Sequence, residues 1–127
     1  MPVLALAFSP DGAELAAGGY HEVTFWNPAD GSLLGRIGGS AQRIQSLDYS
    51  PDGSRLAAAA GTPGRSGEVT LLDPRSRVVA KELDRISDAM LAVAFSPDGS
   101  RLAAAGADNA IRVYDPAAGK RLLTIEQ

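Results

Sequence analysis

The tetrapeptide Ser-Pro-Asp-Gly occupies Ser9–Gly12 and returns at Ser50–Gly53 and Ser96–Gly99. Each copy follows an apolar run that ends in an aromatic residue, and each precedes a leucine and a run of alanines. Proline at the second position sets φ for a type I turn, aspartate suits the third position, and glycine supplies a positive φ at the fourth. Each copy therefore predicts a tight hairpin turn between two short strands.

The three copies begin at residues 9, 50 and 96, so they are spaced 41 and 46 residues apart. Aligned on the turn, each unit contains four strand-length segments separated by turn residues. The longer spacing arises between the second and third segments of the middle unit, where residues 61–67 are Gly-Thr-Pro-Gly-Arg-Ser-Gly and are predicted to form a loop. Constant spacing around the segments, with a variable length in one loop only, indicates stacked repeats.

The alanine runs allow two interpretations. Alanine is the best helix former, so a segment such as residues 56–60 could be helical. Each run has only four or five residues between a turn and a glycine, however, and that is too short to nucleate an independent helix. We therefore predict closely packed inner strands with small side chains.

The composition limits the classes of function. The chain has 127 residues, 45% of them hydrophobic, a net charge of −3 and no cysteine. Mild acidity with scattered Lys and Arg gives no basic surface for nucleic acid or anionic membrane. The lack of cysteine excludes disulfides, thiol catalysis and zinc–thiolate sites. No signal peptide or membrane-spanning run is visible, so we expect a soluble chain that is cytoplasmic by default.

The ends of the third segments carry a further signal. They are Trp26-Asn27, Leu72-Asp73 and Tyr114-Asp115, and turns containing Asp30-Gly31 and Gly119 precede two of the fourth segments. With the Ser-Pro-Asp-Gly turns and the Leu-Ala-Ala runs, these residues make the sequence resemble the WD-repeat (WD40) β-propeller family in its bacterial form. The resemblance implies an all-β fold of three four-stranded antiparallel blades, at about residues 3–37, 44–83 and 90–125.

The sequence also departs from the family pattern. Only Asp108 matches the usual aspartate between the second and third strands, because Tyr20 and Ser66 stand at its equivalents. The hydrogen-bonded tetrad of His, Asp, Ser/Thr and Trp that the resemblance would imply is therefore not expected in any unit. We predict instead that apolar packing between the sheets holds the blades together.

The number of repeats raises the question of ring closure. Blades bury both faces against their neighbours, and three blades leave two apolar faces open. A homodimer, which would give six blades, is favoured over a trimer of nine. One alternative is a fragment of a longer propeller that serves as a regulatory or gating domain of a multidomain bacterial enzyme. Another is an isolated or engineered repeat unit with assembly as its only activity.

No catalytic set is recognisable, so we expect a non-catalytic scaffold or protein-interaction module without metal or cofactor. His21 is the only histidine, and an exposed turn histidine is favoured over a metal ligand or general base. Local capping is favoured for Asp11, Asp52 and Asp98 over a cation-binding ring. Trp26 is predicted to pack between blades, and the predicted core contains Leu4, Leu6, Phe8, Leu47, Tyr49, Leu91, Val93 and Phe95.

The loops on the rim opposite the Ser-Pro-Asp-Gly turns are the predicted binding surface. The resemblance implies that loops between the second and third strands, and between consecutive blades, contact partners. Their mixture of Arg, Tyr, Asn and acidic residues suits a peptide or protein, although purely solvated loops are an equal alternative. The candidate residues are Tyr20, His21, Gln42, Arg43, Arg65, Asp88, Asp108 and Asn109.

Overall fold

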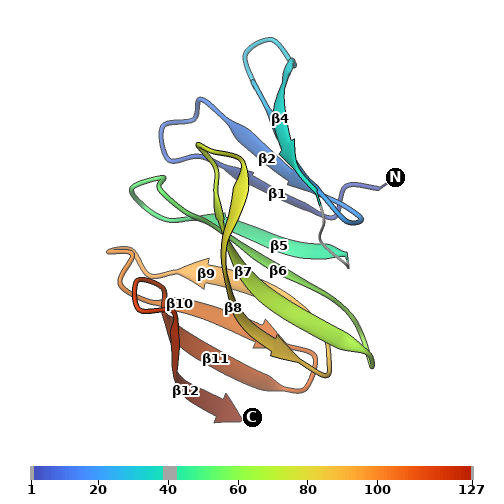
Figure 1. The fold of residues 1–127 in the computed structure, drawn as a ribbon, viewed down its shortest axis with the longest axis vertical. Coiled ribbons are helices and arrows are strands. Elements are labelled where there is room, and N and C mark those ends of the chain that lie inside the picture. Colours follow the sequence, from blue (N-terminus) through green and yellow to red (C-terminus); the bar gives the residue numbers. More distant parts are fainter. Residues whose placement is uncertain (1, 39–42, 127) are drawn as a thin grey trace.

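The computed structural model describes residues 2–38 and 43–126, and these form three four-stranded antiparallel sheets stacked in chain order (Figure 1). Blade 1 contains β1 (Ala5–Phe8), β2 (Leu15–Gly18), β3 (Val23–Trp26) and β4 (Leu33–Ile37). Blade 2 contains β5 (Ile44–Tyr49), β6 (Leu56–Thr62), β7 (Ser66–Asp73) and β8 (Val78–Ile86). Blade 3 contains β9 (Met90–Phe95), β10 (Leu102–Gly106), β11 (Ala110–Asp115) and β12 (Lys120–Glu126). The predicted all-β fold of three blades is confirmed.

The Ser-Pro-Asp-Gly turns join the first two strands of every blade, as predicted. In each turn the glycine N–H donates to the serine carbonyl oxygen at 2.9 Å. The three glycines have φ of 71°, 76° and 76°, a backbone conformation that other residues adopt only at a cost. Adjacent turns also lie close together, because a Cβ on Gly53 would be 3.5 Å from the Pro10 ring and one on Gly99 would be 3.3 Å from the Pro51 ring.

The alanine runs are strands, and β6 shows why they contain alanine. Its residues Leu56 to Gly61 are all buried, because β6 belongs to the middle sheet and has another sheet on each side. Ala58 and Ala60 pack toward blade 1, whereas Ala57 and Ala59 pack toward blade 3. Small side chains on both faces allow three sheets to approach closely at this strand, so tertiary packing overrides the poor strand propensity of alanine.

Each blade has two distinct faces. The leading face points toward the preceding blade, and in blade 2 it contains Leu47, Tyr49, Leu56 and Leu72, which pack on blade 1. The trailing face points toward the following blade, and in blade 2 it contains Ala57, Ala59, Val69 and Leu71, which pack on blade 3. The core thus consists of two apolar layers, one between each pair of neighbouring blades. We call these layers joint 1–2 and joint 2–3.

Two sequence predictions were wrong in detail. Residues 61–67 are not all loop: Gly61 pairs with Gly67 and Thr62 with Ser66, so β6 and β7 extend into a long hairpin. Both glycines are required there because a Cβ at either position would collide with backbone, that of Ala89 included. The hairpin therefore has its own packing role against the connection between blades 2 and 3.

The second correction concerns the core. Leu4, Leu6 and Phe8 are exposed, because the leading face of blade 1 has no preceding blade within this chain. Trp26 is half-buried on that same face rather than enclosed between two blades. Leu91 is exposed, whereas Leu47, Tyr49 and Val93 are buried as predicted.

Candidate interaction surfaces

The rim with the Ser-Pro-Asp-Gly turns is built from local hydrogen bonds. In blade 2, Asp52 Oδ1 accepts hydrogen bonds from Ser50 Oγ at 2.8 Å, from the Ser54 N–H at 2.9 Å and from Ser54 Oγ at 2.7 Å. These donors lower the pKa of Asp52 from 3.8 to about 2, and the Ser54 N–H makes the largest contribution. Asp98 is held in the same way by Ser96 and Ser100. Local capping by these aspartates is confirmed.

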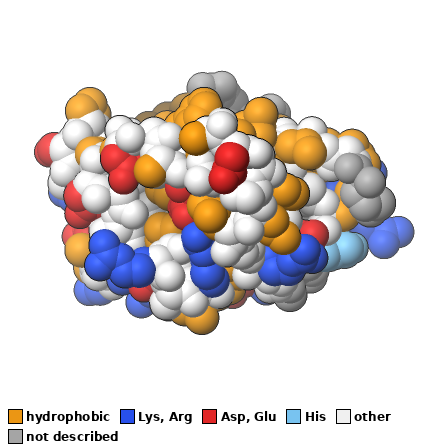
Figure 2. All heavy atoms as spheres, turned by 90° about the horizontal axis from the view of Figure 1, so that it is seen from above, with side chains coloured by type: hydrophobic (Ala, Val, Ile, Leu, Met, Phe, Trp, Pro, Cys, Tyr) orange, Lys and Arg blue, Asp and Glu red, His pale blue; other side chains and the backbone are white. Residues whose placement is uncertain are grey.

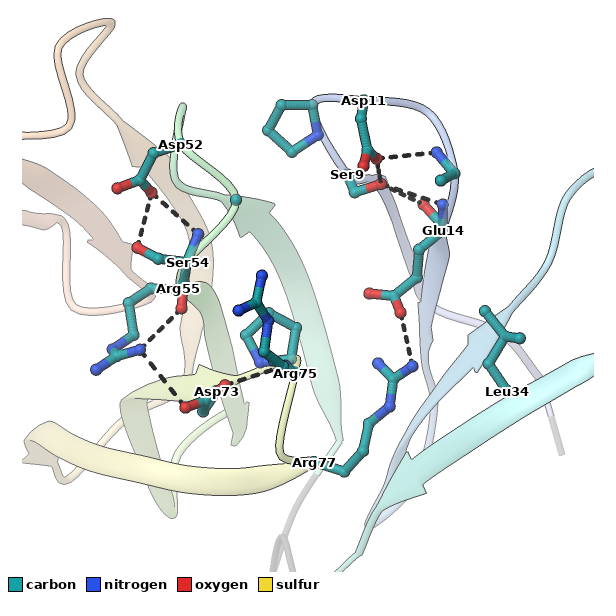
Figure 3. A pocket seen from close by; sticks show the side chains of 14 residues that line it. Ser9, Asp11, Glu14, Leu34, Asp52, Ser54, Arg55, Asp73, Arg75 and Arg77 are labelled. Atoms are coloured by element: carbon teal, nitrogen blue, oxygen red, sulfur yellow. Dashed lines mark hydrogen bonds and ion pairs between the residues drawn. The ribbon is translucent and has the colours of Figure 1, made fainter.

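A groove of about 740 Å³ runs along this rim between blades 1 and 2 (Figure 3). Glu14 lies in its wall, where its carboxylate receives the Tyr49 hydroxyl at 2.6 Å and pairs with the Arg77 guanidinium at 2.7 Å. Burial and then the Glu14 carboxylate raise the pKa of Tyr49 above its ordinary value. These three side chains come from both blades, so they link blade 1 to blade 2 across the groove.

Arg77 occupies a backbone position that favours glycine. The turns before β4, β8 and β12 place Gly31, Arg77 and Gly119 at the same point, with φ of 77°, 61° and 70°. An L-residue in this left-handed region costs about 1–2 kcal/mol. The Arg77 side chain offsets that cost by pairing with Glu14 and lying over the Phe25 ring, 4.1 Å from its centroid.

Joint 2–3 uses other polar contacts. Asp48 Oδ2 accepts the Phe95 N–H at 2.7 Å, and Ser46 Oγ accepts the Val93 N–H at 3.2 Å. The Tyr114 hydroxyl donates to Asp84 at 2.8 Å. Blade 1 has Ala5 and Ala7 where blade 2 has Ser46 and Asp48. Alanine side chains cannot accept hydrogen bonds, so joint 1–2 has no equivalent bonds from β1 side chains to the backbone of β5.

On the opposite rim, the structure brings some of the predicted binding residues together. Arg43 forms a β-bridge with Tyr20, and its guanidinium carbon lies 5.0 Å from the Tyr20 ring centroid. His21 is exposed, has a φ of 68°, and lies next to Tyr20 with the ring centroids 6.4 Å apart. Gln42 lies outside the described residues. The result is a cation–aromatic cluster at the end of blades 1 and 2.

The other predicted binding residues form two separate groups. Asp88 caps the long hairpin of blade 2 by accepting the Gly64 N–H at 2.8 Å, which places it beside the exposed Arg65. Asp108 pairs with Arg112 at 2.6 Å, and Asn109 follows it with a φ of 67°. Asp88 and Asp108 therefore both have structural contacts, whereas Arg43 and Arg65 present exposed cationic side chains.

Both end faces of the stack carry exposed apolar side chains, and two of those on blade 1, Leu6 and Phe8, were predicted to lie in the core. Leu6 and Phe8 on the leading face of blade 1 are 62% and 61% exposed, whereas their equivalents Leu47 and Tyr49 are 7% and 6% exposed. Hydrophobic side chains are visible between charged ones when the molecule is viewed from the blade 1 end (Figure 2). Leu123 and Ile125 are exposed at the other end, on blade 3.

Sequence reasoning missed the contacts between blades. Glu14, Arg77 and Asp48 had no assigned role, although an arginine at a turn position occupied elsewhere by glycine was a usable signal. Within the described ranges, no three His, Cys, Asp or Glu side chains gather closely enough to hold a metal ion. The described part of the chain also contains no helix that could cross a membrane.

Four-stranded antiparallel sheets that stack face to face and repeat the same turns define the β-propeller class. The family model for the WD domain, G-beta repeat (WD40), matches residues 1–27, 31–71 and 81–115, and the chain belongs to this family. Hydrazine synthase from Kuenenia stuttgartiensis has the same fold, with a TM-score of 0.87 and 23% identity over 98% of this chain. The chain spans 36% of that structure's chain. No curated protein matches it.

Proposed function

We propose that this chain is a non-catalytic protein-interaction module that completes its ring by head-to-tail self-association, two copies giving six blades. WD40 repeats indicate a protein-interaction propeller module, which is the general part of this statement. The self-association rests on one observation. The leading face of blade 1 has the apolar pattern of the two leading faces that are buried, but it is open.

The equivalence can be followed through the strand register. Leu15 pairs with Trp26 in blade 1, as Leu56 pairs with Leu72 in blade 2 and Leu102 with Tyr114 in blade 3. The members from blades 2 and 3 are buried against a neighbouring trailing face. A second copy of the chain can offer such a face on its blade 3. The apolar residues of that trailing face are Ala103, Ile111, Val113, Leu123 and Ile125.

The rim turns support the same arrangement. Each proline ring lies near the glycine of the next blade, Pro10 near Gly53 and Pro51 near Gly99. Among the described residues, no atom beyond its immediate neighbours lies within 4 Å of where a Cβ on Gly12 would be. In a closed ring, Pro97 of a second copy would occupy that space and continue the series.

Light scattering tests the proposal on the intact chain. The expected result is a single species with twice the mass of one chain. Phe8→Glu should convert it to a monomer, because a charge buried in the apolar interface is strongly unfavourable. Val78→Glu is the matched control, since Val78 is exposed on the outer strand of blade 2 and should leave the dimer intact. A wild-type monomer would contradict self-association.

A second candidate is a segment of a longer propeller, regulatory or gating in a multidomain enzyme. The observation in its favour is that this chain corresponds to only 36% of the hydrazine synthase chain. In that case further blades of one polypeptide cover the open faces. A monomer that becomes resistant to proteolysis only when additional coding sequence is expressed with it would favour this candidate.

The partner surface of the module is proposed to be the rim containing Arg43 and Arg65. Arg43→Ala and Arg65→Ala should each reduce capture of a defined protein partner without changing the mass of the assembly. Arg75→Ala on the other rim is the control, because Arg75 is exposed in the groove beside Asp73. A stable ring for which no partner is found would leave assembly as its only activity.

A further inference from the structure

A small pocket of about 200 Å³ opens between blades 1 and 2, separate from the rim groove. Its wall is apolar and contains Val23, Ile37, Ile44 and Leu72, all from joint 1–2. A cavity of about 150 Å³ with apolar walls is large enough to take up a molecule the size of benzene. The pocket therefore has room for the stem of one long side chain.

Carboxylates stand beside this apolar wall. Glu68 lines the pocket and is only 7% exposed, and it pairs with Arg85 at 3.0 Å. The same Arg85 nitrogen pairs with Glu82 at 2.6 Å. Among the described residues that line the pocket, these two carboxylates and one guanidinium are the charged groups, so their charges sum to one negative charge. A cationic group is the electrostatic complement of such a site.

Joint 2–3 has a different side chain at the equivalent position. Thr70 lines the pocket and pairs with Ala58, as Arg112 pairs with Ala104 at the equivalent position of blade 3. Arg112 is 8% exposed, faces blade 2 and is paired with Asp108 at 2.6 Å. One joint therefore buries a guanidinium and its stem beside a carboxylate. The other has the shorter threonine at that position and an acidic pocket.

We propose that the pocket between blades 1 and 2 binds one cationic side chain, an arginine or lysine, from a partner protein. The alkyl stem lies against Ile37, Ile44 and Leu72, and the cationic head lies beside Glu68 and Glu82. This site goes beyond the proposed ring closure and does not depend on it, because both of its walls belong to the same chain.

Nuclear magnetic resonance of the intact chain tests the site with n-butylguanidinium as the probe. The expected result is saturable shifts of the backbone amides of Glu68, Thr70 and Leu72. Valerate has a similar stem and the opposite charge, so it should produce no shift at these amides. Equal responses to the two probes, or no response to n-butylguanidinium, would overturn the proposal.

Two variants assign the response to the pocket. Thr70→Arg places in joint 1–2 the side chain that is buried at the equivalent position of joint 2–3, and it should abolish binding of n-butylguanidinium. Thr24→Arg is the matched control, because Thr24 is the equivalent residue on the open leading face of blade 1. Binding that survives Thr70→Arg would contradict the assignment.

Glu68→Gln keeps the side-chain shape and removes the charge, so it tests the same point if Thr70→Arg does not fold. We expect its affinity for n-butylguanidinium to fall about tenfold, the loss of one charge-assisted contact. Unchanged affinity would overturn the proposed role of Glu68. The mass of the assembly should be the same in Thr70→Arg and Glu68→Gln as in the unmodified chain, which separates this result from the test of self-association.

Discussion

Joint 1–2 and joint 2–3 have the same arrangement of strands and apolar residues at equivalent positions, yet different polar contacts reinforce them. In joint 1–2, Glu14 connects Tyr49 and Arg77 at the rim. In joint 2–3, Asp48 accepts a hydrogen bond from the Phe95 N–H of β9, and Asp84 accepts one from the Tyr114 hydroxyl. The apolar layer is therefore common to both joints, and the polar contacts are specific to each.

This difference indicates how the order of the blades in the stack is specified. An apolar face can pack on any similar face, whereas a carboxylate needs a donor at one place. Tyr49 donates a hydrogen bond to Glu14, but Phe95 at the equivalent position lacks a hydroxyl and lines a groove together with Arg55. Exchanging two blades would leave Glu14 without its partners, so the polar contacts specify which blade follows which.

The apolar layer should give the largest effects. Leu56→Ala and Leu102→Ala should each lower the free energy of unfolding by about 2–5 kcal/mol, because both side chains are fully buried at equivalent positions. Denaturant unfolding followed by circular dichroism measures the loss. A marked difference between the two variants would contradict the equivalence of the joints.

The same change at Leu15 connects this comparison to ring closure. Leu15 is the blade 1 equivalent of Leu56 and Leu102 and is only half-buried in the single chain. In a monomer Leu15→Ala should cost clearly less than the other two. In the proposed dimer it should cost as much as they do and weaken the association, as seen by light scattering at low concentration.

Asp48 should give the next largest effect. Asp48→Ala removes the acceptor of the Phe95 N–H, and a hydrogen bond to a charged group contributes about 1.5–3 kcal/mol. Hydrogen exchange at the Phe95 amide should accelerate accordingly. Ser46→Ala is the comparison within the same strand, and its neutral bond to the Val93 N–H should cost about 0.5–1.5 kcal/mol. Unchanged exchange at Phe95 in Asp48→Ala would refute this role.

Arg77→Gly sets two effects against each other in joint 1–2. The variant relieves a left-handed backbone but removes the ion pair with Glu14, and we expect a net loss of about 1 kcal/mol in unfolding free energy. Gly31→Ala should destabilise blade 1 by about 1–2 kcal/mol, because it adds the strain without a partner. A stabilised Arg77→Gly variant would show that the pair contributes less than the strain.

The smallest effect concerns the turns. Asp52 and Asp98 accept two serine hydroxyls each, whereas Asp11 accepts only that of Ser9 because residue 13 is alanine. Ala13→Ser should lower the pKa of Asp11 further, toward the value of about 2 that Asp52 has. Carbon-13 titration of the carboxyl group measures this directly. An unaltered titration would mean that the added hydroxyl does not reach the carboxylate.

The pH dependence of stability follows from the same turns. A carboxyl with a lowered pKa in the folded state stabilises it above its ordinary value of 3.8, and that contribution is lost as the pH falls toward about 2. Asp98→Asn should therefore reduce the decline in stability between these two pH values. The same decline in stability in Asp98→Asn as in the unmodified chain would contradict this contribution of Asp98.

The sequence predicted the repeated features and missed the individual ones. The turn at Ser50–Gly53 and the alanine run of β6 recur, so their spacing gave the blades and the strand order. The contact between Glu14 and Tyr49 joins residues 35 positions apart in different blades, and no local pattern encodes it. The rim residues proposed for binding, Arg43 among them, remain predictions.

The alanines of β6 have a geometric consequence for the whole assembly. Neighbouring blades lie close together at their first strands, β1, β5 and β9, and have few contacts at their fourth strands, β4, β8 and β12. Alanine on the second strand and Phe25, Leu71 or Tyr114 on the third make each interblade layer thinner on the inside than on the outside. Each layer is thus a wedge, and the wedge angle sets how many blades complete a circle. The size of a few side chains therefore sets the circumference of the proposed ring.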